Sequence, residues 1–129
     1  MEYKLKILAT KLRGVYQVET SFHTDNRGSF SRLFCNNDLR KITKERRIAQ
    51  VNYSYTKYSG IIRGMHFQKP PHAEMKFVRC IKGKVWDVIV DLRKNSPSFL
   101  KWYAEELSNE NSKMLIIPEG CAHGFQSLD

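Results

Sequence analysis

The sequence lacks any long apolar run, and its short apolar stretches fall far below the ~20 residues that a membrane-spanning helix requires. It also lacks a secretory leader pattern, because the lysine-bearing N-terminus is followed by only a brief apolar stretch. The three cysteines include no Cys-x-x-Cys pair, which argues against a disulfide framework or a zinc knuckle. We therefore expect a cytoplasmic protein with reduced thiols and no membrane partner.

Proline- and glycine-rich linkers, internal repeats and low-complexity segments are also missing. A chain of 129 residues without such a boundary is expected to form one domain over residues 1–129. Acidic residues are scarce, with 13 against 22 lysines and arginines, which gives a net charge of +9. This charge attracts polyanions, and it does not choose among nucleic acid, an acidic membrane face and a phosphorylated small molecule.

Helical periodicity is nearly absent, and short apolar runs separated by turn residues dominate instead. The thin helical signal predicts a turn around Asn37 to Lys44 and another brief turn at Ser108. Many short strands in one small domain predict a sandwich, jelly roll or barrel that binds ligands in its mouth or interior. The strands are expected at residues 15–18, 29–34, 49–55, 60–68, 75–81, 84–92, 99–106 and 113–117.

Two strands carry titratable groups whose direction the alternation of residues constrains. In the strand from 84 to 92, Asp87 and Asp91 share one face, which is either the buried or the solvent-facing one. In the strand from 60 to 68, Arg63 and His66 are three positions apart and would point to opposite faces. Gly64 lies between them, and glycine is the residue type that hosts a β-bulge, which would turn Arg63 to the side of His66.

Two segments fit the paired motifs of the cupin jelly roll. Gly60 precedes His66 by six positions, and Pro118 to His123 has the pattern Pro-x-Gly-x-x-His. The predicted fold class is thus all-β, a cupin-type jelly roll or β-sandwich barrel with little helix. A metal would have to be held by His66, His123 and Glu74, because Gln68 stands where metal-binding cupins have a second histidine. This set is short, so we expect no metal.

Seven ordered segments resemble the dTDP-4-dehydrorhamnose 3,5-epimerase family over nearly the whole chain. The resemblance implies a metal-free, cofactor-free cupin homodimer that inverts C3 and C5 of a 4-keto-6-deoxy sugar carried on thymidine diphosphate. The matching segments are Asp25–Phe30, Gln50 with Asn52, Gly60–Gln68, Lys76–Cys80, Gly83–Arg93, Ser96–Pro97 and Pro118–Phe125.

The resemblance implies a catalytic role for two residues. His66 matches the base that removes a proton beside the ketone, a task that suits histidine near neutral pH. Lys76 matches the lysine near the ketone oxygen, where a fixed cation offsets developing negative charge. His123 resembles a second histidine of the active site. Asp87 is expected to orient or charge-balance His123 or Lys76 without touching the substrate.

The same resemblance implies a binding pocket for the nucleotide. Arg63 and Arg27 match the contacts to the diphosphate, which the planar guanidinium binds through two oxygens at once, and Arg27 would reach in from the dimer partner. Gln50 and Asn52 match polar residues of the pocket wall. Phe30 would stack on the base.

Two departures from the family pattern stand out. Arg32 replaces an acidic residue at the nucleotide edge. The family's proton-returning tyrosine and an aspartate partner for the base match no position up to Asp129, as expected of a piece of a longer epimerase or of a short homologue. We expect full epimerase activity to be weak or absent in the 129-residue form. Uncovered sheet edges tend to associate, so a homodimer formed through a sheet edge is predicted.

Other functions compete with the epimerase. A nucleotide-sugar ketoisomerase would use similar binding groups to move the ketone. A metal-dependent cupin enzyme and a non-catalytic nucleotide-sugar-binding module are the remaining alternatives. Nucleic acid is not expected as a partner, because the basic and aromatic residues follow the epimerase motifs and no nucleic-acid fold signature.

Overall fold

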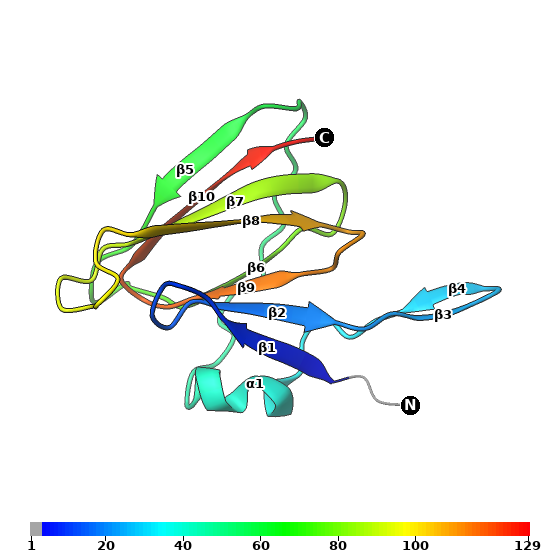
Figure 1. Cartoon of the computed structure of the whole chain (residues 1–129), viewed down its shortest axis with the longest axis horizontal. Helices are drawn as coiled ribbons and strands as arrows, with labels where there is room; N and C mark the ends of the chain where they lie inside the picture. The colour runs from blue at the N-terminus through cyan, green and yellow to red at the C-terminus, as the bar shows by residue number, and fades with distance from the viewer. Residues whose placement is uncertain (1–3) are drawn as a thin grey trace.

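The computed structural model describes residues 4–129, which form three layers: one helix and two facing antiparallel sheets (Figure 1). The helix α1 spans Asn36–Thr43. The strands are β1 (Leu5–Ala9), β2 (Tyr16–Thr20), β3 (His23–Asp25), β4 (Gly28–Phe30), β5 (Ile62–His66), β6 (Lys76–Arg79), β7 (Lys84–Asp91), β8 (Trp102–Ser108), β9 (Met114–Ile117) and β10 (Cys121–Ser127).

The first sheet has the strand order β1-β2-β9-β6, and the second has the order β5-β10-β7-β8. All strand pairs are antiparallel. Gln17 of β2 donates a hydrogen bond of 3.0 Å to Glu105 of β8, which brings these two strands together across the layers. The predicted all-β fold of the cupin type is confirmed.

The hydrophobic core has two parts, one on each face of the first sheet. The part between the sheets consists of Leu12, Val15, Ile89, Leu107, Leu115, Ile117 and Cys121. The part under the helix consists of Leu5, Val18, Leu39, Met114 and Ile116. β9 contributes to both parts, so all four of its residues are buried. Burial on both faces explains why four consecutive residues of β9 are apolar.

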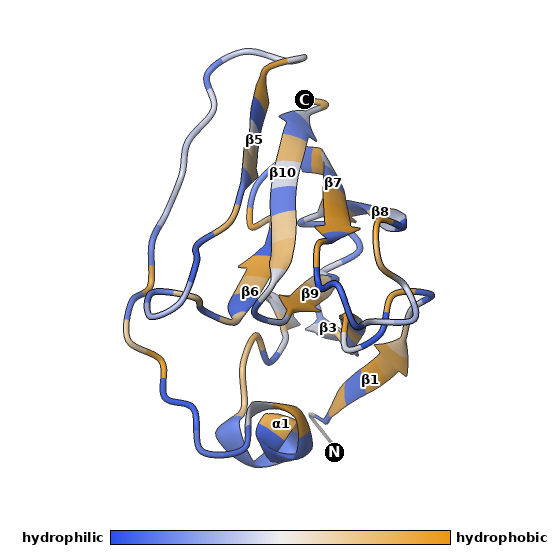
Figure 2. Ribbon diagram, turned by 90° about the vertical axis from the view of Figure 1, so that its left-hand side faces the viewer, coloured by the Kyte–Doolittle hydropathy of each residue, from blue (hydrophilic) through white to orange (hydrophobic). Residues whose placement is uncertain are grey.

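The helix α1 covers the outer face of the first sheet, as Figure 2 shows from the side. Leu39 and Thr43 are its buried residues, and polar residues dominate the rest of its short sequence. The backbone N–H of Leu5 donates to the Asp38 carboxylate at 3.2 Å, which ties β1 to the first turn of the helix. The turn expected around residues 37–44 is part of a helix of eight residues, Asn36–Thr43.

The strands β3 and β4 form a two-stranded hairpin that projects sideways from the two sheets (Figure 1). In this hairpin, His23 lies opposite Phe30 and Asp25 lies opposite Gly28. The hairpin pairs with neither of the larger sheets. Its side chains are mostly exposed, so it contributes little to the core.

Most of the predicted strands are present with shifted ends, and two predictions are wrong. Residues 49–55 form no strand, and the segment predicted at 29–34 ends its pairing at Phe30. Val51, Tyr53 and Tyr55 alternate as in a half-buried strand, yet they are exposed and no described strand lies alongside them to satisfy the backbone. The strands β1, β3 and β10 were not predicted.

Candidate active site

The face of β7 that carries two carboxylates points inward, which decides between the two alternatives left by the sequence. Asp87, Ile89 and Asp91 have no exposed surface, while Trp86 on the opposite face is 42% exposed. Asp91 lies at the end of the strand and accepts hydrogen bonds from Arg93, Ser96 and Ser98. Asp87 has a different partner.

Asp87 is paired with His123 of the neighbouring strand β10. The Nε2 atom of His123 lies 2.8 Å from Oδ2 of Asp87, and the histidine side chain is 12% exposed. The two residues are diagonal neighbours, because His123 lies opposite Ile89 and Asp87 lies opposite Phe125. The carboxylate therefore holds the imidazole in one orientation on the inner face of the sheet.

Burial raises the pKa of Asp87, and the hydrogen bond and charge of His123 only partly oppose this effect. Oδ2 contacts the histidine, but no group in the described part of the chain donates to the buried Oδ1. A groove of about 910 Å³ is lined by Asp87 and Phe125, together with Arg79, Lys82 and segment 51–57. The carboxyl group thus faces His123 on one side and borders this groove.

His66 lies directly opposite His123, on the other neighbour of β10. Arg63 lies opposite Phe125, so three positions on β5 match two positions on β10, which defines the β-bulge that the sequence suggested at Gly64. Residues opposite each other point to the same face, and His123 and Phe125 share that face, with their ring centroids 6.3 Å apart. The bulge thereby brings Arg63 and His66 to one side. Both side chains are exposed.

Lys76 approaches the same interior from the first sheet. It lies opposite Ile117 on β9, and both Ile117 and Val78, two positions further along β6, pack in the core between the sheets. Lys76 therefore shares the inward face and is half-buried. On the inward faces, the second sheet therefore carries His66, His123 and Arg63, and the first sheet carries Lys76.

Four of the predicted binding residues lie away from the two histidines, although Asn52 lines the groove that Asp87 borders. Asn52 donates to Gln50 at 3.3 Å within the strandless segment, where both are exposed. Arg27 pairs with Asp25 at 2.7 Å near the tip of the projecting hairpin, and Phe30 of that hairpin is 57% exposed. Figure 1 shows the hairpin pointing away from β5 and β10, which carry the histidines.

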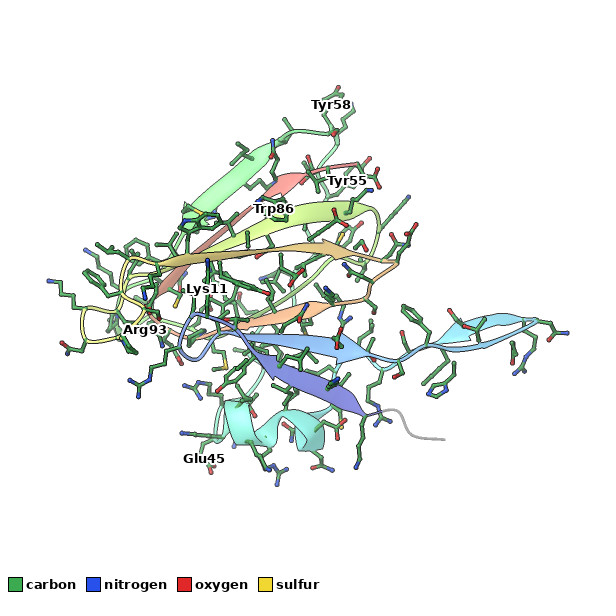
Figure 3. The ribbon with its side chains drawn as sticks, in the orientation of Figure 1. Lys11, Glu45, Tyr55, Tyr58, Trp86 and Arg93 are labelled. Carbon is green, nitrogen blue, oxygen red and sulfur yellow. The ribbon has the colours of Figure 1, made fainter. Side chains whose placement is uncertain are left out.

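One link joins the strandless segment to the site. Arg63 donates from Nη2 to the backbone carbonyl of Tyr55 at 2.9 Å. Figure 3 shows Tyr55 and Tyr58 near the end of the molecule where β10 finishes. Ser127 at that end donates to the carbonyl of Tyr58 at 2.6 Å. Tyr55 is thus held by Arg63 of β5, and Tyr58, three positions further along, by Ser127 of β10.

The structure also shows a polar cluster that sequence reasoning missed. Tyr103 donates to Glu105 at 2.6 Å, and Lys113 lies 3.3 Å from the same carboxylate. Burial and the nearby Glu105 raise the pKa of Tyr103. Tyr103 lies opposite Ile89, on the row that continues to His123 and His66. The signal in the sequence was the alternation of Tyr103 and Glu105, but their partners come from distant strands.

Among residues 4–129, no group of three or more His, Cys, Asp or Glu side chains is arranged to hold a metal ion. Glu74 therefore does not join His66 and His123 as a third ligand. None of the helices in the described residues is long and apolar enough to cross a membrane.

The fold and the site define a class: a cupin-type antiparallel β protein with two histidines, a buried carboxyl and cationic side chains on its inner faces. The sequence pattern of one family, dTDP-4-dehydrorhamnose 3,5-epimerase, matches residues 9–129. The chain belongs to this family.

Similar proteins agree with this assignment. A dTDP-4-dehydrorhamnose 3,5-epimerase from Shigella flexneri is 40% identical over 122 residues, which cover 94% of this chain and 67% of the relative. The crystal structure of the Bacillus anthracis epimerase with TDP and PPi bound is 38% identical, with a TM-score of 0.91, and covers 96% of this chain and 71% of that one.

A third protein, an epimerase from Legionella pneumophila solved in complex with dTDP-4-keto-L-rhamnose, is 33% identical with a TM-score of 0.90. That match covers 97% of this chain and 66% of the other. The chain spans about half to two thirds of the length of the first curated relatives that it matches.

Proposed function

We propose that this chain acts on a dTDP-4-keto-6-deoxy sugar and moves protons at the carbons beside the ketone, as a 3,5-epimerase. The observation that carries the proposal is the convergence of His66, His123 and Arg63 on one inner face, with Asp87 behind His123. The family membership and the ligands named for the Bacillus and Legionella relatives support the substrate class.

The chemistry follows from the groups at hand. His66 accepts the proton from the carbon next to the ketone, and the electron pair of the broken C–H bond moves into an enolate. The ammonium group of Lys76 stabilises the negative charge on the enolate oxygen. A proton from water, added to the opposite face of that carbon, regenerates the ketone with inverted configuration, and His66 releases its proton to the solvent, so no oxidant or reductant is consumed. Since no residue up to Asp129 matches the family's proton-returning tyrosine, full epimerase activity of the 129-residue form is expected to be weak or absent.

Binding groups complete the proposal. Arg63 binds the diphosphate, and His123, oriented by Asp87, contacts the sugar. Arg27 and Phe30 project away from their own histidines, and we therefore assign them to the site of a second copy in a homodimer. Gln50 and Asn52 line the nucleotide pocket in this assembly. Residues 1–129 act as one domain that needs no cofactor.

We place the reaction in the cytoplasm. Cys35, Cys80 and Cys121 are free thiols in the structure, which fits a reducing compartment.

The test is proton NMR of dTDP-4-keto-6-deoxyglucose with the protein in deuterated water. The expected result is incorporation of deuterium at C3 and C5, and His66→Asn lowers its rate at least ~100-fold. Exchange at these carbons reports on His66 even where protonation from the opposite face is slow, because His66 can return a deuteron from the solvent to the face from which it took the proton.

Other outcomes identify the competing functions. Migration of the ketone without exchange at C5 would make the protein a ketoisomerase. Stoichiometric iron, nickel or zinc that is required for exchange would make it a metal-dependent cupin enzyme. Binding of dTDP without any exchange would leave a nucleotide-sugar-binding module.

A further inference from the structure

Two glycines from neighbouring strands touch at the bulge of β5. Gly64 lies in β5 between Arg63 and His66, and Gly124 lies in β10 between His123 and Phe125. His66 lies opposite His123, and Arg63 lies opposite Phe125, so Gly64 and Met65 together face Gly124 alone. The bulge therefore lies between the pair His66–His123 and the pair Arg63–Phe125.

The space at this contact admits no side chain on Gly64. A Cβ atom there would lie 2.6 Å from the Cα atom of Gly124 and 2.9 Å from the carbonyl oxygen of His123. Both neighbours are backbone atoms, so no change of rotamer relieves the overlap. Gly64 also has a φ of +118°, a region that residues with a side chain rarely adopt.

Gly124 is restricted for a separate reason. A Cβ atom on Gly124 would lie 2.7 Å from the sulfur of Met65 and 2.9 Å from the carbonyl oxygen of Arg63. Its φ is not in the positive region, so the restriction comes from contact alone. Substitution of Gly124 therefore tests the approach of the two strands without adding backbone strain.

We propose that the contact between Gly64 and Gly124 is the positioning element of the active site, because it holds the bulge that places Arg63 and His66 on one face. In a strand without the bulge, residues three positions apart point to opposite faces. A substrate that carries a diphosphate at one end and a ketosugar at the other requires both side chains on the same side. This inference rests on the proposed function.

The experiment compares Gly124→Ala and Gly64→Ala with Gly60→Ala as the control. Gly60 has a φ of +87° in the segment that leads into β5, but no atom lies within 4 Å of the place that a Cβ atom would occupy there. The control therefore carries the backbone strain without the collision. For each folded variant, calorimetry gives the affinity for dTDP, and NMR in deuterated water gives the exchange rate at C3 and C5.

We expect Gly124→Ala and Gly64→Ala to weaken dTDP binding about tenfold and to slow exchange about 100-fold. Gly60→Ala is expected to lower the melting temperature but to keep both the affinity and the exchange rate. Folded Gly124→Ala protein with wild-type affinity and exchange would overturn the inference.

A second variant covers the case in which Gly124→Ala does not fold. Deletion of Met65 in the Gly124→Ala background removes the sulfur contact and leaves Arg63 and His66 two positions apart, on one face without a bulge. Recovery of dTDP affinity and of exchange supports the inference. Recovery of the melting temperature without either one overturns it.

The two proposals fail in different ways. Wild-type protein that binds dTDP but exchanges no deuterium would overturn the proposed epimerase function alone. The effect of Gly124→Ala on dTDP affinity would still report on the placement of Arg63.

Discussion

At the scale of single residues, Asp87 and Asp91 show how neighbours decide the behaviour of a buried acid. Both lie on the inner face of β7 with no exposed surface. Asp91 accepts hydrogen bonds from Arg93, Ser96 and Ser98 at 2.5–2.8 Å. Asp87 has one partner, His123, and one oxygen without a donor in the part of the chain described. We therefore expect replacement by asparagine to affect stability differently at the two positions.

Asp91→Asn is expected to lower the free energy of unfolding at neutral pH by about 3 kcal/mol, because Arg93 would lose the charge of its partner. Urea denaturation measures this change. Asp25→Asn, which breaks an exposed ion pair with Arg27, is the control and should change stability by less than ~1 kcal/mol.

The loss at Asp91 should also depend on pH. Burial raises the pKa of Asp91, but the donors from Arg93, Ser96 and Ser98 outweigh burial, and the net pKa is lowered. An unfolded aspartate titrates near ~3.9, so the stabilisation is complete above that pH and is lost as the pH falls toward the folded pKa. Wild type and Asp91→Asn should therefore converge in acid; a difference that widens below pH ~4 would contradict this account.

Asp87→Asn is expected to leave stability at neutral pH unchanged within about 1 kcal/mol or to raise it, because burial disfavours the charged form that asparagine replaces. The exchange rate should fall about tenfold, since the oriented charge behind His123 is lost. Thermal unfolding and NMR exchange on the same samples separate the two effects. A large loss of stability would show that Asp87 is a structural acid like Asp91.

Lys76→Met is expected to slow exchange about 100-fold while dTDP affinity stays the same, because in the proposed mechanism the ammonium group acts on the enolate oxygen and not on the diphosphate. Lys6→Met is the matched control, since Lys6 is an exposed lysine on β1 at the other edge of the same sheet. Equal loss in both variants would remove Lys76 from the mechanism.

At the scale of secondary structure elements, α1 and the candidate active site lie on opposite faces of the first sheet. Leu39 is fully buried against Val18, Met114 and Ile116 on the helix side. Leu39→Ala should lower the free energy of unfolding by about 2–5 kcal/mol and leave dTDP affinity of the folded protein unchanged. Loss of affinity in folded Leu39→Ala protein would show that the helix supports the site.

The elements also show what the sequence could predict. The helical signal was thin and confined to residues 37–44. Alternation of apolar residues located most strands, because those residues face a core within the chain. It failed at 49–55, where the alternation is real but no strand lies alongside. It also missed β10, whose Ala122 and Gly124 are poor strand formers. Two neighbouring strands, β5 and β7, supply the pairing that the residues of β10 do not favour by themselves.

At the scale of the whole molecule, the site that we propose is completed by a second copy of the chain. Alternation put Asp87 and Asp91 on one face without deciding which face is buried, and Gly64 indicated the bulge that brings Arg63 and His66 together. The roles of His66, Arg63, His123 and Lys76 came from the family resemblance and stay predictions. The cluster of Gln17, Tyr103 and Glu105 was not foreseeable, since Gln17 and Glu105 are 88 positions apart and meet only through the packing of two sheets. The hairpin with Arg27 points away from these residues (Figure 1).

If Arg27 serves the site of a second copy, two defective variants should complement each other. Arg27→Ala and His66→Asn are each expected to exchange slowly. After mixing and reassembly, each heterodimer holds one intact site, so exchange should recover to about a quarter of the wild-type rate. A mixture as slow as its components would place Arg27 in its own chain's site, and a stable monomer at micromolar concentration would contradict the dimer.

The strand order of the first sheet has a consequence for the growing chain during synthesis. β2 pairs with β9, and Leu39 of α1 packs against the same strand, so these early segments find their neighbour only when residues 114–117 have left the ribosome. Until then, Leu5, Val18 and Leu39 have no apolar partner from β9 to cover them. Contacts so distant in sequence form slowly, so we expect the apolar residues of the nascent N-terminal third to be prone to aggregation until β9 is available.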